Sequence, residues 1–142
     1  MTKRKTIISL AIGSTILLAG LAANVFWGKI IGLDGQIFIA ETPLSDAAYE
    51  KGLGGRQRLC QHCAMLFRFS QKGEYAFWMH GMNFDLDILW IADGKIVYIK
   101  KDFSKDSAVI VTPIAPADSV LEIGAGMSDK YNFKIGDKVH IY

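Results

Sequence analysis

The residues with the most evident chemistry are two cysteines three positions apart, in Cys60-Gln-His-Cys63. Outside the cytoplasm such a pair can close a local disulfide, and thiols of low pKa can exchange disulfides with other proteins. Cys60, His62 and Cys63 are also residue types that bind zinc, although a zinc site takes about four ligands. Residue 64 is Ala64 rather than His, so the motif does not attach a c-type haem. A disulfide or inert thiols, a redox-active pair and a metal site therefore stay open.

Two carboxylates, Asp85 and Asp87, alternate with apolar residues and would share one face of a strand. On one face they could share a proton, bind a cation or hold a sugar hydroxyl, and the alternative is a solvated face with ordinary acids. The sequence holds no Gly-x-Ser-x-Gly, His-Glu-x-x-His or Walker motif. It therefore indicates no catalytic nucleophile, and we expect neither an enzyme nor a cofactor.

Aromatic residues are dense between positions 75 and 90, namely Tyr75, Phe77, Trp78, Phe84 and Trp90. Aromatic faces can stack on sugars or bases, but in a small β domain they more often form the core. Alternation along a strand would place Trp78 and His80 on one face and Tyr75 and Phe77 on the other. We expect only one of these sets to face water.

The start of the chain has the pattern of a membrane anchor. Lys3, Arg4 and Lys5 precede a run of uncharged residues, 6–26, whose helix would be about 31 Å long, close to the ~30 Å hydrocarbon core. Basic residues stay in the cytoplasm. We therefore expect a cytoplasmic tip (1–5), a single transmembrane anchor in the lipid bilayer (6–27) and an extracytoplasmic remainder. The alternative is a signal peptide whose cleavage would release the protein.

Charge and composition limit the partners of the remaining chain. Of 142 residues 51% are hydrophobic and 21% charged, which excludes a disordered chain. The formal net charge of +2 comes from the N-terminal tip, because residues 6–142 hold 13 Lys and Arg against 14 Asp and Glu, a net charge of −1. Without a basic stripe, nucleic acid is not an expected partner. No pattern indicates an oligomeric state.

The elements that must position these residues are mostly short strands. Residues 28–35 are predicted to be a linker and residues 36–142 one domain. Thr42-Pro43 begins a predicted helix that Gly52 ends, and Asp93-Gly94 indicates a hairpin. Strands are predicted at 36–40, 64–69, 74–79, 86–91, 95–100, 119–123 and 138–142, with a second short helix near 127–131. We expect an α+β fold, mainly β, with about seven short strands in a compact barrel-like sheet and two short helices.

The order of several segments resembles the family called domain of unknown function 192 (uncharacterised protein family 0127). The matching segments are Ala40-Glu-Thr42, Gly52-Leu53, Arg56, Met65-Leu66-Phe67-Arg-Phe69, Phe77-Trp78-Met79, Leu86-Asp87-Ile88, Val120-Leu121-Glu122 and Ile135-Gly136-Asp137-Lys-Val139. The resemblance implies a compact, mostly β domain that is often secreted or membrane-tethered, and no established reaction. The chain departs from the pattern at Ala64 (usually Gly), His80-Gly81 (Lys-Asn or Lys-Asp), Asp85 (Pro) and Asn132 (often Gly).

These observations favour a tethered binding or accessory domain over an enzyme. The candidate ligand-binding residues are Arg56, Trp78, His80 and Asp87. The ligand would be small and polar, either anionic or carbohydrate-like, because a guanidinium suits bidentate contact with carboxylate or phosphate. The rival hypothesis is a thiol-redox or metal-binding protein that uses Cys60 and Cys63. A third is a structural envelope protein without a ligand.

Overall fold

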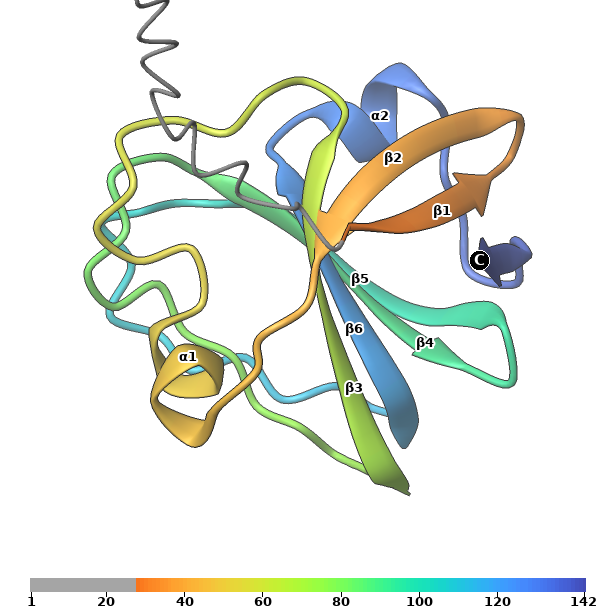
Figure 1. The fold of residues 1–142 in the computed structure, drawn as a ribbon, viewed down its shortest axis with the longest axis horizontal. Coiled ribbons are helices and arrows are strands. Elements are labelled where there is room, and N and C mark those ends of the chain that lie inside the picture. Colours follow the sequence, from red (N-terminus) through yellow and green to blue (C-terminus); the bar gives the residue numbers. More distant parts are fainter. Residues whose placement is uncertain (1–27) are drawn as a thin grey trace, which may run out of the picture.

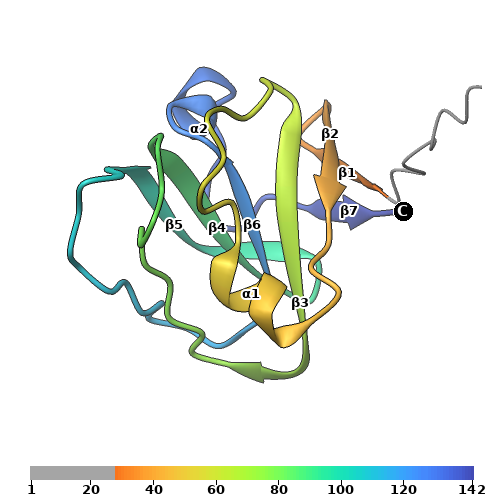
Figure 2. The ribbon, with the colours of Figure 1, turned by 60° about the vertical axis from the view of Figure 1, so that its left-hand side comes forward.

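The computed structural model describes residues 28–142, so the predicted cytoplasmic tip and membrane anchor lie outside the described residues. Within residues 28–142 no helix is long and apolar enough to cross a membrane. Seven strands form one sheet, and two short helices lie at different ends of it (Figures 1 and 2). The elements are β1 (Lys29–Leu33), β2 (Gln36–Glu41), α1 (Asp46–Lys51), β3 (Cys63–Gly73), β4 (Leu86–Ala92), β5 (Lys95–Phe103), β6 (Ala117–Gly124), α2 (Met127–Lys130) and β7 (Val139–Ile141).

The strand order is β5-β4-β6-β3-β2-β1-β7, and β2 and β3 are the parallel pair among otherwise antiparallel neighbours. The mainly β fold with two short helices is confirmed, but the sheet is not closed into a barrel. Its edge strands meet only at the start of β5, through the bridge between Lys95 and Lys138 and three backbone hydrogen bonds between residues 94–96 and 136–139. The rest of β5 pairs with β4 alone, so the sheet stays open along that edge.

The predicted linker is wrong, because residues 29–33 form β1. This strand pairs with β2 from Lys29 opposite Ala40 to Leu33 opposite Gln36, around a turn at Asp34-Gly35 with positive φ at both residues. The side chains of Ile31 and Leu33 are buried in the core. Of the two glycines in the predicted linker, Gly32 lies within this strand and Gly35 forms part of the turn.

The strand predicted at 74–79 is also absent. β3 continues beyond the predicted end at residue 69 to Gly73, and the segment after it pairs only through an isolated bridge between Phe77 and Val111. Leaving the sheet lets Phe77 pack edge-on against Phe67 and Trp90, at ring-centroid distances of 5.0 and 5.7 Å. This irregular segment forms part of the wall of the site described below.

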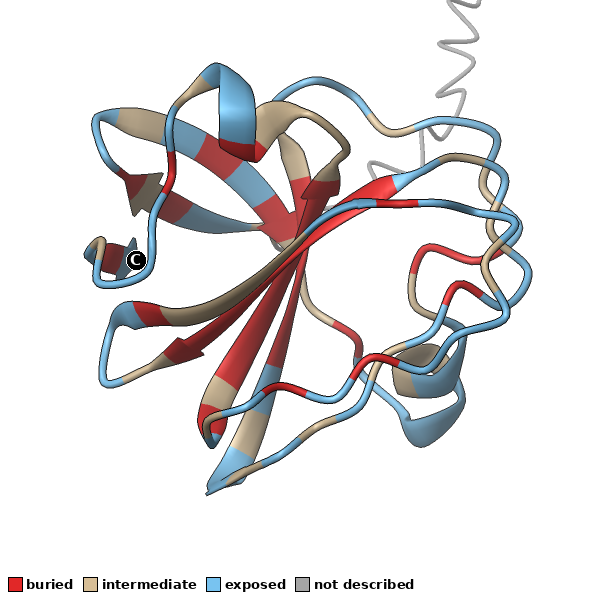
Figure 3. Ribbon diagram, turned by 180° about the vertical axis from the view of Figure 1, so that it is seen from behind, coloured by how far each residue is buried: buried red, intermediate tan, exposed pale blue. Residues whose placement is uncertain are grey.

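Buried residues concentrate on the central strands, as Figure 3 shows. Both faces of β4 and β6 are covered, so the sheet has a core on each side. One core includes Phe38, Leu121 and Phe133, and the other includes Phe67 and Trp90. The second core lies on the side of the sheet that carries α1. Side chains do not fill all of the space beneath this helix, and the cavity described below lies there.

Local sequence explains how α1 is placed over this second core. Ser45 caps its N-terminus by accepting a hydrogen bond from the Ala48 N–H at 3.3 Å. Gly52 ends the helix with φ of 51°, a conformation that favours glycine, while its N–H donates to the Ala48 carbonyl oxygen. The predicted stop at Gly52 is confirmed, although the helix begins three residues after Pro43.

Candidate functional site

A cavity of about 310 Å³ lies between α1, the sheet face of β3 and β6, and the irregular segment 74–82. Six aromatic side chains line it: Tyr49, Phe67, Phe69, Tyr75, Phe77 and Trp78. His80 and Glu122 are the polar residues at its rim and floor that matter most for its chemistry. Binding cavities in proteins commonly combine such an apolar lining with a few polar groups.

The aromatic wall is held by packing between its own rings. Tyr49 from α1 packs edge-on against Phe67 of β3, with ring centroids 5.7 Å apart. Phe69 stacks flat on Tyr75, with centroids 3.4 Å apart and planes within 9°. The Tyr75 carbonyl oxygen accepts a hydrogen bond from the Trp90 indole N–H at 2.8 Å, which fixes the irregular segment to β4. The cavity is therefore largely preformed.

Glu122 lies at the floor of this cavity, in the middle of the sheet. Its strand, β6, runs between β3 and β4, so that Met65 and Ile88 stand opposite Glu122 on either side. The residue is 5% exposed, and its Oε2 atom has no hydrogen-bond partner among residues 28–142. An unpartnered buried polar atom costs free energy, so this one requires an explanation.

Burial determines the protonation state of Glu122. It raises the pKa of the carboxyl group to about 8, while the positive charge of Arg56 acts weakly in the opposite direction. At neutral pH the group is therefore mostly protonated, and can both donate and accept a hydrogen bond. Carboxyl groups perturbed in this way inside clefts are often found at functional sites.

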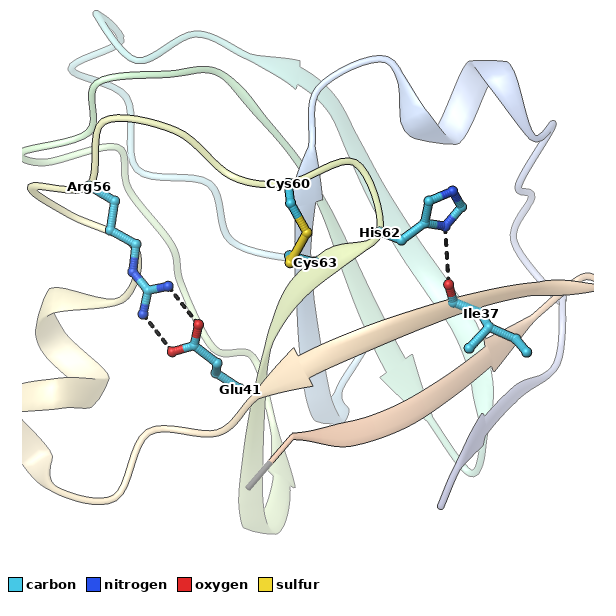
Figure 4. Close-up of a disulfide and its surroundings, with 6 residues drawn as sticks. All are labelled: Ile37, Glu41, Arg56, Cys60, His62 and Cys63. Atoms are coloured by element: carbon cyan, nitrogen blue, oxygen red, sulfur yellow. Dashed lines mark hydrogen bonds and ion pairs between the residues drawn. A yellow bond between two sulfur atoms is a disulfide. The ribbon is translucent and has the colours of Figure 1, made fainter. Parts of the chain in front are cut away.

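Gly52 forms the boundary between this cavity and a second one. The second cavity, about 440 Å³, is lined by Gly52, Arg56 and the end of β2. There Arg56 donates to both carboxylate oxygens of Glu41, each at 2.7 Å, as the dashed lines in Figure 4 mark. The hydrogen bonds from Arg56 hold the pKa of Glu41 below its usual range. An anionic ligand of Arg56 would have to compete with Glu41 for the same guanidinium face.

Asp87 has a different role from the one predicted. It is fully buried, and its Oδ1 accepts hydrogen bonds from the backbone N–H groups of Asp102 and Gly126 while its Oδ2 accepts one from Ser128. These three bonds tie the end of β5 and the start of α2 to β4. Asp85 is exposed and accepts instead from the Lys105 N–H at 2.7 Å, so the two acids do not form a shared site.

The two cysteines are joined in a disulfide, with their Cα atoms 5.0 Å apart. Their loop is closed by a hydrogen bond from the Cys63 N–H to the Cys60 carbonyl oxygen. His62 points away from the sulfur atoms, with Nδ1 3.1 Å from the Ile37 carbonyl oxygen (Figure 4). Within residues 28–142 no three His, Cys, Asp or Glu side chains are grouped to hold a metal.

The four predicted ligand-binding residues are not brought to one cavity. Trp78 and His80 line the aromatic cavity with ring centroids 5.6 Å apart, Arg56 lines the second cavity, and Asp87 lines neither. Sequence reasoning missed Glu122 as a site residue. The available signal was the charged Glu122 among the apolar residues Val120, Leu121 and Ile123, on the same face of the strand as Val120.

The fold and this cavity define a small, mainly β domain with an internal polar group facing an aromatic pocket. The chain belongs to the DUF192 family, described as "Uncharacterized ACR", whose model matches residues 30–141. No curated protein matches the chain.

Two crystal structures are similar to it. One is a protein of Sinorhizobium meliloti 1021 described as a "putative transcription regulator", 26% identical with a TM-score of 0.76, covering 82% of this chain and 95% of that one. The other is a protein of unknown function from Novosphingobium aromaticivorans, 27% identical with a TM-score of 0.73, covering 80% and 83% of the two chains.

Proposed function

We propose that the chain is a membrane-tethered, extracytoplasmic binding module that holds a small ligand in the aromatic cavity. The observation that carries this proposal is Glu122, a buried carboxyl group without a hydrogen-bond partner at the floor of that cavity. A group that serves only the fold would be replaced at little cost by an apolar residue of similar volume. A ligand that contacts Glu122 supplies the partner the fold does not.

The shape and chemistry of the cavity define the kind of ligand. Its rings offer apolar faces, and Glu122 offers one deep polar contact. Trp78 is 54% exposed, so its indole can close over a bound molecule from the rim. A carbohydrate-like molecule, with apolar C–H faces and hydroxyl groups, has both features. Aromatic rings hold and orient a molecule but do not attack its bonds, so we propose binding rather than catalysis.

Two features support a location outside the cytoplasm. The charge pattern of residues 1–27 is that of a single-pass anchor with a cytoplasmic tip. The Cys60–Cys63 disulfide is typical of proteins in oxidising compartments. The name of the Sinorhizobium relative suggests a role at DNA, but the near-neutral charge of residues 6–142 does not favour DNA binding here.

The redox hypothesis for Cys60 and Cys63 is less well supported. Reactive thiols of such pairs are usually activated at a helix N-terminus or beside a cation. Here Cys63 begins strand β3, and the segment before it is a loop. We therefore propose that the disulfide braces the loop between α1 and β3.

A ligand screen by thermal shift tests the binding proposal, using the full chain in non-ionic detergent. A ligand specific for the native state raises the melting temperature, so a library of neutral sugars, carboxylic acids and amines is expected to yield stabilising compounds. Trp78→Ala should abolish their effect. Ile114→Ala, which removes a side chain that is 82% exposed and lines neither cavity, should not. The proposal fails if no compound stabilises the protein, or if both variants respond like wild type.

A further inference from the structure

We propose that the aromatic cavity takes an organic ammonium ion, with the cationic head paired to the Glu122 carboxylate and its alkyl groups enclosed by the surrounding rings. This inference rests on the proposed function, because it assumes that the cavity binds a ligand. It goes beyond it by giving the ligand a charge, which neither the fold nor the relatives assign.

Among the described residues Glu122 has no counter-charge beside it in the sheet. The residues opposite it on the neighbouring strands, Met65 and Ile88, are apolar. Arg56 is engaged by both oxygens of Glu41 on the far side of Gly52. A cation that enters the cavity beside it would favour the ionised form of this buried carboxyl group.

Lys51 does not supply that cation. It lines both cavities, but its Cε atom lies 3.9 Å from the position that a Cβ of Gly55 would occupy, and Gly55 belongs to the second cavity. The end of the Lys51 side chain is thereby directed toward the second cavity. Neither Lys51 nor Arg56 is therefore paired with Glu122, which leaves that place open to a bound cation.

The lining of the cavity also favours a cation. The faces of Trp, Tyr and Phe rings attract cations, and aromatic enclosures are the usual recognition sites for quaternary ammonium groups. Six aromatic side chains line this cavity, and two of them, Tyr49 and Phe67, come from the elements directly above and beside Glu122. A neutral ligand would contact the same rings but would leave the Glu122 carboxyl group protonated. An anion would meet the negative charge of Glu50, which also lines the cavity.

Binding of a cation at Glu122 is coupled to the release of a proton. Burial raises the pKa of Glu122 to about 8, so at pH 7 an ammonium ion must displace a proton to form the ion pair. As the pH increases toward about 8, the affinity for the ammonium ion should therefore rise by up to tenfold per pH unit. Above about pH 8 the affinity should become constant. The other titratable or charged groups facing the cavity are Tyr49, Glu50 and Lys51 from α1, Tyr75 and His80 from the irregular segment, and Arg56 beyond Gly52.

Choline chloride is the probe, and 3,3-dimethyl-1-butanol is its uncharged control of the same shape. Isothermal titration of the full chain in non-ionic detergent at pH 8 should show choline binding at least tenfold more tightly than the alcohol. At pH 7 the binding enthalpy of choline should change with the ionisation enthalpy of the buffer, because close to one proton is released. Equal affinities for the two compounds, or no proton release at pH 7, would overturn the inference.

Two variants separate the charge of Glu122 from other causes. Glu122→Gln keeps the shape of the side chain and should remove the preference for choline over the alcohol. A positively charged His80 would also weaken the binding of a cation at low pH, so His80→Gln tests this second cause. If Glu122 is responsible, His80→Gln should keep the pH dependence of binding. If Glu122→Gln does not fold, the pH profile and proton release of the wild type decide the question.

The outcomes also distinguish this inference from the proposed function. If a neutral sugar binds in a manner that depends on Trp78 while choline does not bind, the cavity is a binding site and the ammonium inference is wrong. If neither choline nor any screened compound binds, both are wrong.

Discussion

Gly52 and Glu122 lie against each other beneath the end of α1: a Cβ added to Gly52 would stand 3.6 Å from Oε2 of Glu122 and 3.4 Å from Cζ of Phe67. The residue that ends the helix is thus also the one that leaves space above the buried carboxyl group. On its other side Gly52 lines the cavity of the Arg56–Glu41 pair. The glycine that ends α1 therefore also contributes to the shape of the candidate site.

The pH dependence of stability reports on Glu122. Its carboxyl group ionises near 4.5 in the unfolded chain and near 8 in the folded one, so between these values the folded chain holds the extra proton. The free energy of unfolding should therefore fall as the pH rises, by up to ~1.4 kcal/mol per pH unit. Over the whole window the loss is on the order of 5 kcal/mol. Denaturant unfolding between pH 5.5 and 8.5 measures this slope.

Glu122→Gln is the matched control, because it removes the ionisation and keeps the volume. The variant should lose most of this slope, and at pH 8.5 it should be more stable than wild type. A wild type whose stability does not fall over this range, or a variant with the same slope, would contradict the assignment of a buried, protonated Glu122.

Gly52→Ala should weaken ligand binding as well as the fold. The backbone at Gly52 has φ of 51°, which costs a residue with a Cβ about 1–2 kcal/mol, and the added methyl group would narrow the cavity above Glu122. Gly35→Ala is the matched variant, since Gly35 also has positive φ but its Cβ would meet nothing within 4 Å. Both should lower the melting temperature, and only Gly52→Ala should lower the affinity of a ligand found by the screen.

Asp87 should prove to be a structural residue. Asp87→Asn replaces one of the two acceptor oxygens that receive backbone N–H groups of Asp102, Gly126 and Ser128. Because bonds to a charged acceptor are worth about 1.5–3 kcal/mol each, the free energy of unfolding should fall by roughly 2–3 kcal/mol. Ligand affinity of the folded variant should be unchanged. A loss of ligand affinity with unchanged stability would instead indicate that Asp87 takes part in ligand binding.

Removing the disulfide should lower the stability of the domain and leave ligand binding unchanged. The bond closes a loop of only four residues, for which chain entropy gives about 2 kcal/mol. The Cys60→Ser/Cys63→Ser double variant should therefore melt lower but bind the same ligand. A thiol titration of the native protein should detect no free thiol. Thiols that appear and disappear across physiological redox potentials would favour the redox hypothesis instead.

Local signals predicted the parts of the fold that depend on few residues. The Asp93-Gly94 pair predicted the β4–β5 turn, where both residues have positive φ, and Gly52 predicted the end of α1. The linker prediction failed because Gly32 is compatible with a strand when Ile31 and Leu33 beside it are buried against β2. The prediction of a strand after Gly73 failed because aromatic packing of Phe77 outweighed the β propensity of its segment.

The site was harder to predict than the fold, because it depends on contacts between distant segments. The Glu122 carboxyl group is buried only because β3 and β4 lie on either side of its strand. The sequence of that strand does not indicate the cavity, which is formed by α1 and the irregular segment. Arg56 was identified as a candidate anion site, but its partner Glu41 lies 15 residues earlier. Trp78 and His80 were placed together by sequence, and the structure brings them to the same rim.

The central claim is that the aromatic cavity holds a ligand in contact with Glu122. The most direct test is a crystal structure of the chain purified without refolding from the cells that naturally produce it, or bound to the strongest compound of the screen. We expect continuous ligand density between Trp78 and Glu122, with a polar atom of the ligand within hydrogen-bond distance of a Glu122 oxygen. A cavity filled only by water, with the bound compound located elsewhere on the domain, would contradict the claim.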